Sequence, residues 1–192
     1  MEVTPIAQGL PTNFAASVGR IIARWAYVEW LLSQAIYDML GIGPKQGRIS
    51  VRTPRAEDCI TMIEELLQSH RLALSENFGP AKTILRNAEN KRNTLAHSIW
   101  LKVPKTKEIR IQVTKGNWNL GPNGKVSKKV IPEGIPVNAA LLASYRNEVE
   151  IAVKTALHVR QVVILAMTAL QDIQRERAQT DHQPRGQKTS IH

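Results

Sequence analysis

Apolar residues in the first part of the chain recur with the spacing of an amphipathic helix. They stand at every third or fourth position from Phe14 to Met39, which places them along one stripe of a 3.6-residue helix. Thr12 or Asn13 is a suitable N-cap for this helix, and Gly41 suits its C-terminal end. We therefore expect one long helix over most of the segment before Gly41.

Two further helices are predicted in the first half of the chain. Thr53-Pro54 has the sequence of a helix start, and apolar residues continue at helical spacing to about Leu74. Pro80, directly after Gly79, opens the third helix. This helix is unusually polar over residues 86–94, where a helix buried in a core carries apolar side chains. It is therefore not an ordinary core helix.

The period of the pattern changes from about Ile99 onward. Apolar and polar residues alternate over Ile109–Val113, which is the pattern of a half-exposed strand. Turns rich in glycine and proline follow, and residues 125–130 suit a return strand. We expect a β-hairpin or a small sheet inserted at about residues 99–131.

The last predicted helix begins near Asn138 and is the longest. It carries two interleaved seven-residue ladders of apolar residues, one of Leu142, Val149, Ala156, Val163 and Leu170 and one of Tyr145, Ala152, Val159, Ala166 and Ile173. Val162, Leu165 and Ala169 widen the apolar stripe, so we expect this half of the helix to be buried on more than one side. The polar residues 178–192 have nothing to bury and are predicted to be a disordered tail.

Basic residues are concentrated in the predicted β insertion. The formal net charge of the chain is +10, and residues 102–131 supply +7 of it, from 8 basic and 1 acidic side chains. These basic groups surround Trp118, and together they make a stacking and phosphate-binding surface for unpaired RNA. The alternative is an exposed hairpin that its lysines keep soluble. The basic residues are Lys102, Lys105, Lys107, Arg110, Lys115, Lys125, Lys128 and Lys129.

The composition also indicates the compartment. Cys59 is the one cysteine, so no intramolecular disulfide forms, and no Cys and His residues have the spacing of a zinc site. We expect neither a metal nor a cofactor. The N-terminus lacks the features of a signal peptide, and the longest apolar run, residues 162–170, is far shorter than the ~20 residues of a membrane-spanning helix. We therefore expect a cytoplasmic protein without a membrane segment, in which residues 162–170 are buried.

The third predicted helix ends in a motif that resembles a known family. Arg92, Asn93 and His97 match, residue by residue, the arginine, polar residue, short spacer and histidine of the HEPN superfamily. Residues 24–29 of the first helix, with their aromatic side chains and Glu29, also resemble the first helix of many small members. The resemblance implies a mainly α, HEPN-like four-helix up-and-down bundle. We expect that domain to cover residues 12–177, with the β insertion at 99–131 between the third and fourth helices.

The resemblance implies metal-independent cleavage of RNA, in the setting of a toxin or an antiviral-defence effector. His97 would act as general acid or base around the 2′-hydroxyl, and Arg92, beside Asn93, would stabilise the charged phosphorane. These residue types suit the chemistry independently, since imidazole exchanges a proton near pH 7 and a guanidinium grips phosphate with two donors. Deoxyribose lacks the 2′-hydroxyl nucleophile, so the substrate would be RNA.

The helical wheel places a constraint on this site. Asn93 and His97 share one face of a helix, whereas Arg92 and His97 diverge by ~140°. We therefore expect either that the helix unwinds before His97 or that a second chain completes the site, and we favour a homodimer. Tyr27 and Trp30 lie opposite the main stripe of the first helix, as a second packing face or a subunit interface.

Two other interpretations stay open. Arg92 lies between apolar positions on the helical wheel, so it also suits a structural role in which the carboxylate of Glu29 neutralises it. The chain would then be a non-catalytic RNA-binding or assembly module. In a third interpretation, the basic insertion binds an acidic protein, such as an antitoxin, instead of RNA.

Overall fold

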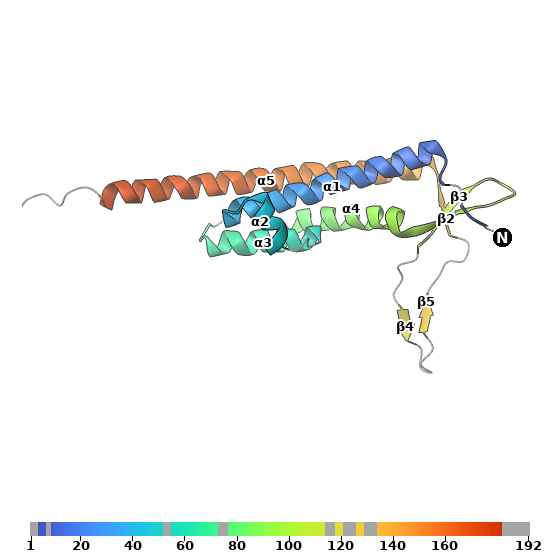
Figure 1. The fold of residues 1–192 in the computed structure, drawn as a ribbon, viewed down its shortest axis with the longest axis horizontal. Coiled ribbons are helices and arrows are strands. Elements are labelled where there is room, and N and C mark those ends of the chain that lie inside the picture. The colour runs from blue at the N-terminus through green and yellow to red at the C-terminus, as the bar shows by residue number, and fades with distance from the viewer. Residues whose placement is uncertain are drawn as a thin grey trace, which may run out of the picture.

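The computed structural model of the chain describes residues 4–6, 9–51, 55–72, 77–113, 118–120, 126–128 and 134–181. Most of these residues are helical (Figure 1). The helices are α1 (Thr12–Leu40), α2 (Pro44–Ser50), α3 (Ala56–Ser69), α4 (Gly79–His97) and α5 (Ala139–Asp181). The strands are β1 (Thr4–Pro5), β2 (Ser98–Lys102), β3 (Ile109–Val113), β4 (Trp118–Leu120), β5 (Val126–Lys128) and β6 (Ile135–Val137).

The four long helices match the four that the sequence predicts. Gly41 ends α1 in the left-handed conformation, with a φ of 64°, and its N–H donates to the carbonyl of Asp38 at 3.3 Å. Helix α3 is shorter than expected at its C-terminal end, because Ser69 is its last residue. The short helix α2 was not predicted, since it buries Gly47 and no apolar stripe. The start expected at Thr53-Pro54 lies outside the described residues.

Helices α1 and α5 run parallel, side by side along the long axis of the molecule (Figure 1). Arg24 pairs with Glu150 at 2.6 Å, and further along both helices Asp38 lies 3.7 Å from Arg160. Residue numbers therefore increase in the same direction on both helices. The long chain between them, which includes α4 and the sheet, makes this parallel arrangement possible.

The order of the helices is not the expected up-and-down one. Glu29 of α1 lies close enough to Cys59 of α3 to raise the pKa of that thiol, and the ring of His70 after α3 lies 3.3 Å from the carbonyl of Met39. Helix α3 is therefore parallel to α1, whereas consecutive helices of an up-and-down bundle are antiparallel. The segment that contains α2 returns the chain to the middle of α1, where Cys59 lies near Glu29. The mainly α class is confirmed, and the up-and-down order is wrong.

The core lies where α1, α3, α4 and α5 face one another. Trp25, Leu32 and Ile36 of α1 are fully buried, as are Ile60 and Ile63 of α3. Burial of such side chains contributes about 1.5–3 kcal/mol each to folding. The two ladders of α5 supply the remaining wall, with Val149, Ala152, Ala156, Val159 and Val163 almost completely buried. The apolar periodicity therefore identified the core face of the first two thirds of α5.

The last third of α5 extends past the end of α1 (Figure 1). Leu165 is 61% exposed, and Ile164 and Ile173 are exposed as well, so the expectation that residues 162–170 are buried on more than one side is wrong. The physical reason is length, because no described helix reaches far enough to cover this part of α5. The helix also continues to Asp181, so residues 178–181 are helical and not part of a tail. The remainder of the predicted tail, 182–192, lies outside the described residues.

By length and composition alone, α5 is the one described helix that qualifies as a candidate membrane span. Its most apolar 18-residue window has a mean hydropathy of 1.3, and 33% of that window is buried within the structure. The core helix of a soluble protein meets the same criteria of length and composition.

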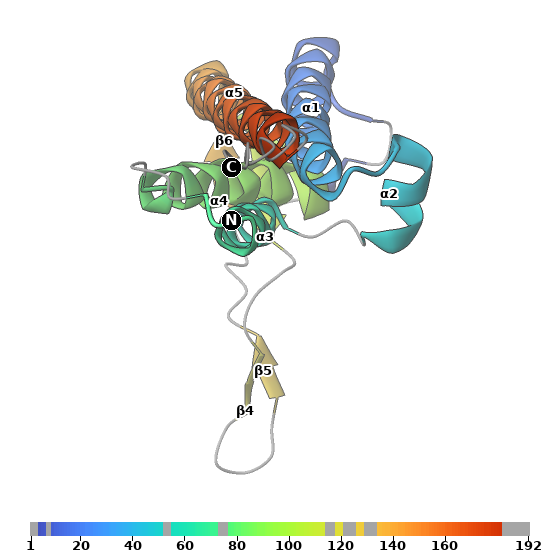
Figure 2. The same cartoon turned by 90° about the vertical axis from the view of Figure 1, so that its left-hand side faces the viewer.

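The β insertion is a sheet that extends beyond the expected limits. Its strand order is β1-β2-β3-β6, and all neighbours pair antiparallel, with Ile111 between Trp100 and Ile135. The predicted strand over Ile109–Val113 is confirmed as β3. The return strand expected at 125–130 is not its partner, because β5 pairs with β4 in a separate two-stranded unit and β6 takes that place. Figures 1 and 2 show β4 and β5 standing away from the bundle.

Candidate functional site

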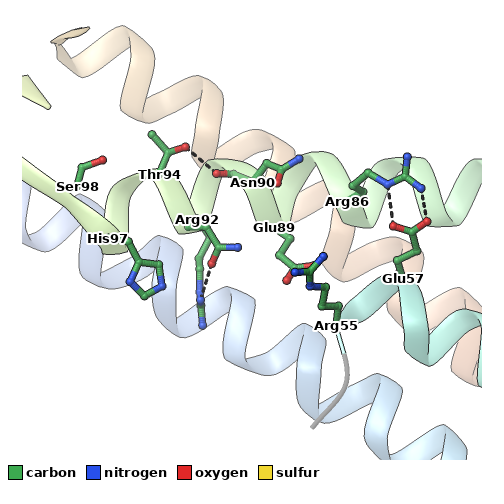
Figure 3. A pocket seen from close by; sticks show the side chains of 10 residues that line it. Arg55, Glu57, Arg86, Glu89, Asn90, Arg92, Thr94, His97 and Ser98 are labelled. Atoms are coloured by element: carbon green, nitrogen blue, oxygen red, sulfur yellow. Dashed lines mark hydrogen bonds and ion pairs between the residues drawn. The ribbon is translucent and has the colours of Figure 1, made fainter. Parts of the chain in front are cut away.

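The polar face of α4 lines a cavity of about 680 Å³ that contains the whole motif. Helix α4 remains regular to its last residue, His97, and Ser98 then enters β2 with extended backbone. Arg92, Asn93 and His97 all contribute to the wall (Figure 3). The full lining consists of Arg55, Glu57, Arg86, Glu89, Asn90, Arg92, Asn93, Thr94, His97 and Ser98.

Arg92 is held by a small network that begins in α1. The indole N–H of Trp25 donates to Oε1 of Glu29 at 2.6 Å, and the same oxygen lies 3.6 Å from Nη2 of Arg92. Nη1 of Arg92 donates to Oδ1 of Asn93 at 2.7 Å. The pairing of Arg92 with Glu29 that the sequence suggested is therefore confirmed. Within the described part of the chain, Nε of Arg92 is buried and has no hydrogen-bond partner.

Arg92 and His97 face the same cavity although they are separated by five positions on a continuous helix. Figure 3 shows both side chains leaving α4 on the side of α1. The long arginine side chain reaches along the helix surface, and His97 stands at the final turn, where no further turn covers it. The helical wheel, which considers only the directions of the Cα–Cβ bonds, predicted that the two side chains diverge, and in the structure both line one cavity. No unwinding of α4 is required.

The cavity also contains residues that the sequence did not single out. Arg86 of α4 forms a bidentate ion pair with Glu57 of α3, in which Nε of Arg86 donates to Oε2 of Glu57 at 2.7 Å and Nη2 donates to Oε1. The hydrogen bond from Arg86 lowers the pKa of the Glu57 carboxyl below its ordinary value. Glu89 lies next to Arg55, and burial raises the pKa of its carboxyl. The polarity of residues 86–94 marked this part of α4, but nothing local marked the residues of α3.

The charges of the cavity are mixed, with an arginine-rich balance. Arg55, Arg86 and Arg92 line it together with Glu57 and Glu89, so the cavity has three guanidinium groups and two carboxyl groups. Arg86 is committed to a bidentate carboxylate, whereas Arg92 has a looser ionic partner at 3.6 Å. Of these two guanidinium groups, that of Arg92 is the better placed to bind an added anion.

The expected RNA-binding residues of the insertion are dispersed. Lys102, Lys105 and Lys107 are exposed around the β2–β3 turn. Arg110 is different, because it pairs with Glu108 at 3.1 Å and donates to the carbonyl of Gly134 at 3.2 Å. These contacts give it a structural role in the sheet, and its role as a phosphate ligand stays a prediction. Trp118 and Lys128 are directly opposite each other in the β4–β5 register. Lys115, Lys125 and Lys129 lie outside the described residues.

The aromatic pair of α1 is exposed and does not form a second packing face. The rings of Tyr27 and Trp30 stack with centroids 5.7 Å apart, and the Arg160 guanidinium lies 5.6 Å from the centre of the Trp30 ring. Trp30 is 48% exposed. This exposure contradicts a second packing face within the chain, and the subunit interface stays a prediction.

Cys59 and His70 both lie in surroundings that indicate a structural role. Burial raises the pKa of Cys59 to about 12, which keeps the thiol protonated and unreactive. His70 contacts the Met39 carbonyl at the end of the bundle. Across the described ranges, no three His, Cys, Asp or Glu side chains lie together as a metal site requires. Comparisons with protein-family models, curated proteins and solved structures find no match to this chain.

Proposed function

We propose that this protein is a metal-independent endoribonuclease that cleaves single-stranded RNA through attack of the 2′-hydroxyl. The observation that carries the proposal is that Arg92, Asn93 and His97 line one cavity within a single chain. The cavity of about 680 Å³ falls in the size range of ligand pockets in proteins. The HEPN resemblance of the motif supports the same activity, and a toxin or antiviral role belongs to the proposal on that ground.

His97 transfers the protons in the proposed reaction. The imidazole removes the proton of the 2′-hydroxyl as the O2′–P bond forms, and the imidazolium so produced gives that proton to the 5′ oxygen as the P–O5′ bond breaks. The products are a 2′,3′-cyclic phosphate and a 5′-hydroxyl end. The exposure of His97 at the end of α4 leaves it accessible to a polynucleotide.

Arg92 binds the phosphate in the proposed complex. Its guanidinium donates to the non-bridging oxygens, whose negative charge increases in the transition state. Glu29 and Asn93 orient the guanidinium from two sides, at 3.6 Å and 2.7 Å, so that part of its conformational freedom is already removed before RNA binds. The exposed lysines of the β2–β3 turn would attract the RNA backbone.

Cleavage of a labelled single-stranded RNA in the presence of a chelator tests the proposal. We expect cyclic-phosphate products from the wild-type protein and a loss of at least about 100-fold in rate for His97→Ala and for Arg92→Ala, from the usual contributions of acid–base and electrostatic catalysis. His158→Ala and Arg175→Ala are matched controls, because these exposed residues lie on α5 outside the cavity. Equal rates for all five proteins would refute the assignment of the site.

A non-catalytic RNA-binding or assembly module is the second candidate, and the Glu29–Arg92 ion pair favours it. If Arg92 is only structural, Arg92→Ala lowers stability by leaving Glu29 without its ionic partner, and His97→Ala changes neither stability nor RNA binding. Urea unfolding of both variants, measured beside the cleavage assay, separates the two candidates. RNA binding without cleavage in the wild-type protein supports the module.

A further inference from the structure

A second cavity lies against α4 and shares two residues with the first. It has a volume of about 410 Å³, and Asn90 and Thr94 belong to the walls of both cavities. The two cavities therefore adjoin along the same helix. The second cavity is lined by Asn87, Asn90, Lys91, Thr94, Ile135, Tyr145 and Glu148.

The second cavity offers the groups that bind a flat, polar ring. Tyr145 presents a half-buried aromatic ring, and the ammonium of Lys91 lies 5.0 Å from the centre of that ring. The amides of Asn87 and Asn90 are exposed on α4, and the half-buried carboxylate of Glu148 follows Tyr145 by one turn of α5. An aromatic surface, a cation and a set of in-plane donors and acceptors are the elements of nucleobase recognition in single-stranded RNA.

We propose that the second cavity is a nucleobase subsite that selects guanine in the nucleotide next to the cleaved phosphate. The inference rests on the proposed function for its substrate class and adds a determinant of sequence specificity. A strand that crosses α4 at Asn90 and Thr94 places one phosphate beside Arg92 and His97 and a neighbouring base beside Tyr145. The base stacks on the tyrosine ring, and Lys91 moves from the ring to the phosphate of the same nucleotide.

Glu148 determines which base is selected. An ionised carboxylate only accepts hydrogen bonds, and its two oxygens match two adjacent N–H donors. Guanine presents such a pair in its N1–H and its 2-amino group. Uracil presents one N–H between two carbonyl oxygens, which the carboxylate repels, and adenine and cytosine place a ring-nitrogen acceptor next to their amino groups. The amides of Asn87 and Asn90 provide donors for the guanine O6 and N7 acceptors.

RNA binding in a His97→Ala background tests this inference without requiring cleavage. The probes are two fluorescent hexanucleotides, one of uridine only and one with a central guanosine, and the readout is anisotropy. We expect the guanosine probe to bind about tenfold more tightly, within the range of discrimination given by bidentate base contacts. Glu148→Gln should bring the ratio of the two probes' affinities close to one, and Tyr145→Leu should weaken binding of the guanosine probe. Glu65→Gln, an identical change at an exposed position of α3, should leave the ratio unchanged.

The binding assay distinguishes failure of the guanine subsite from failure of the proposed cleavage activity. An affinity ratio near one for the protein with an unaltered second cavity, or a ratio that Glu148→Gln leaves unchanged, overturns the guanine subsite even if the protein cleaves RNA. A tenfold ratio that disappears with Glu148→Gln supports the subsite even if no RNA is cut, in which case the proposed function fails alone. Where RNA is cut, mapping of the cleavage sites should show them at a constant distance from guanosines in the wild type and not in Glu148→Gln.

Discussion

Glu89 lies in the motif cavity between groups of opposite charge. Burial is the main cause that raises the pKa of its carboxyl, and Glu29 acts in the same direction, whereas Arg55, Arg92 and a hydrogen bond from the backbone of Ala56 act against it. The carboxylate is therefore less well stabilised in the folded protein than in water. A carboxyl whose pKa is perturbed in this way, in a cavity, is a candidate functional group.

We expect Glu89→Gln to be more stable than the wild type at pH 7. The folded chain holds the Glu89 proton more tightly than the unfolded chain does, so the carboxyl contributes its full stability below its ordinary pKa of 4.5. This contribution is lost as the pH rises through the folded-state pKa. The difference between the two proteins should therefore shrink as the pH falls towards 4.

Urea midpoints measured by circular dichroism between pH 4 and pH 8 check this expectation. Glu65→Gln is the control, because it makes the same chemical change at an exposed position. A wild-type protein that is more stable than Glu89→Gln at pH 7 would mean that attraction to Arg55 and Arg92 outweighs the cost of burial.

At the scale of secondary-structure elements, α2 lies in the connection between α1 and α3 and packs against α1. Its Gly47 lies directly against the buried ring of Tyr37, and a Cβ added at Gly47 would overlap that ring. Because Tyr37 is packed in the core, movement of its ring would disrupt the packing around it and lower the free energy of unfolding. The absence of a side chain at this position is therefore what permits α2 to dock.

We expect Gly47→Ala to lower the free energy of unfolding by about 1–3 kcal/mol, which is typical of overpacking at a well-packed contact. Gly19→Ala is the matched control, since a Cβ at Gly19 in α1 meets no atom within 4 Å. That substitution should raise stability by about 0.5–1 kcal/mol, because alanine loses less conformational entropy in a helix. Chemical denaturation of both variants gives the comparison, and equal effects would show that α2 is not docked on Tyr37.

At the scale of the whole molecule, α5 is much longer than its neighbours. Its 43 residues span about 64 Å, against about 44 Å for the 29 residues of α1. The apolar ladders continue into the last third of α5 with Leu170 and Ile173. Ile173 is exposed, as are the neighbouring Ile164 and Leu165, and no described helix covers them. A continuous seven-residue ladder is the pattern by which helices associate.

We expect the protein to be a homodimer in which the exposed end of α5 contacts a second copy. The double variant Leu165→Glu and Ile173→Glu should be monomeric at micromolar concentration by light scattering, because two buried charges would oppose association. Gln171→Glu, at an exposed position of the same segment, is the control and should remain dimeric. A monomeric wild type would contradict the expectation, and a wild type that is soluble only in detergent would indicate a membrane contact instead.

Most of the local features of the fold were predictable. The stripe from Phe14 to Met39, the start of α4 near Pro80 and the ladders of α5 depend on residues three, four or seven positions apart, and these meet on any helix. Glu29 was identified as the partner of Arg92 from its position at the edge of a helical stripe, and the 3.6 Å contact confirms it. Helix α2 was missed because its docking depends on Tyr37 and not on a periodicity of its own.

The sequence by itself determined the four long helices and placed Arg92, Asn93 and His97 near the end of one of them, since those relations involve neighbours along the chain. Only the tertiary structure decided that α3 runs parallel to α1 and brings Arg55 and Glu57 to the same cavity. It also decided that β6, and not residues 125–130, completes the sheet. The physical reason is that helix and strand formation depends on local spacing, whereas the meeting of distant elements depends on which packing of all their apolar faces buries the most surface.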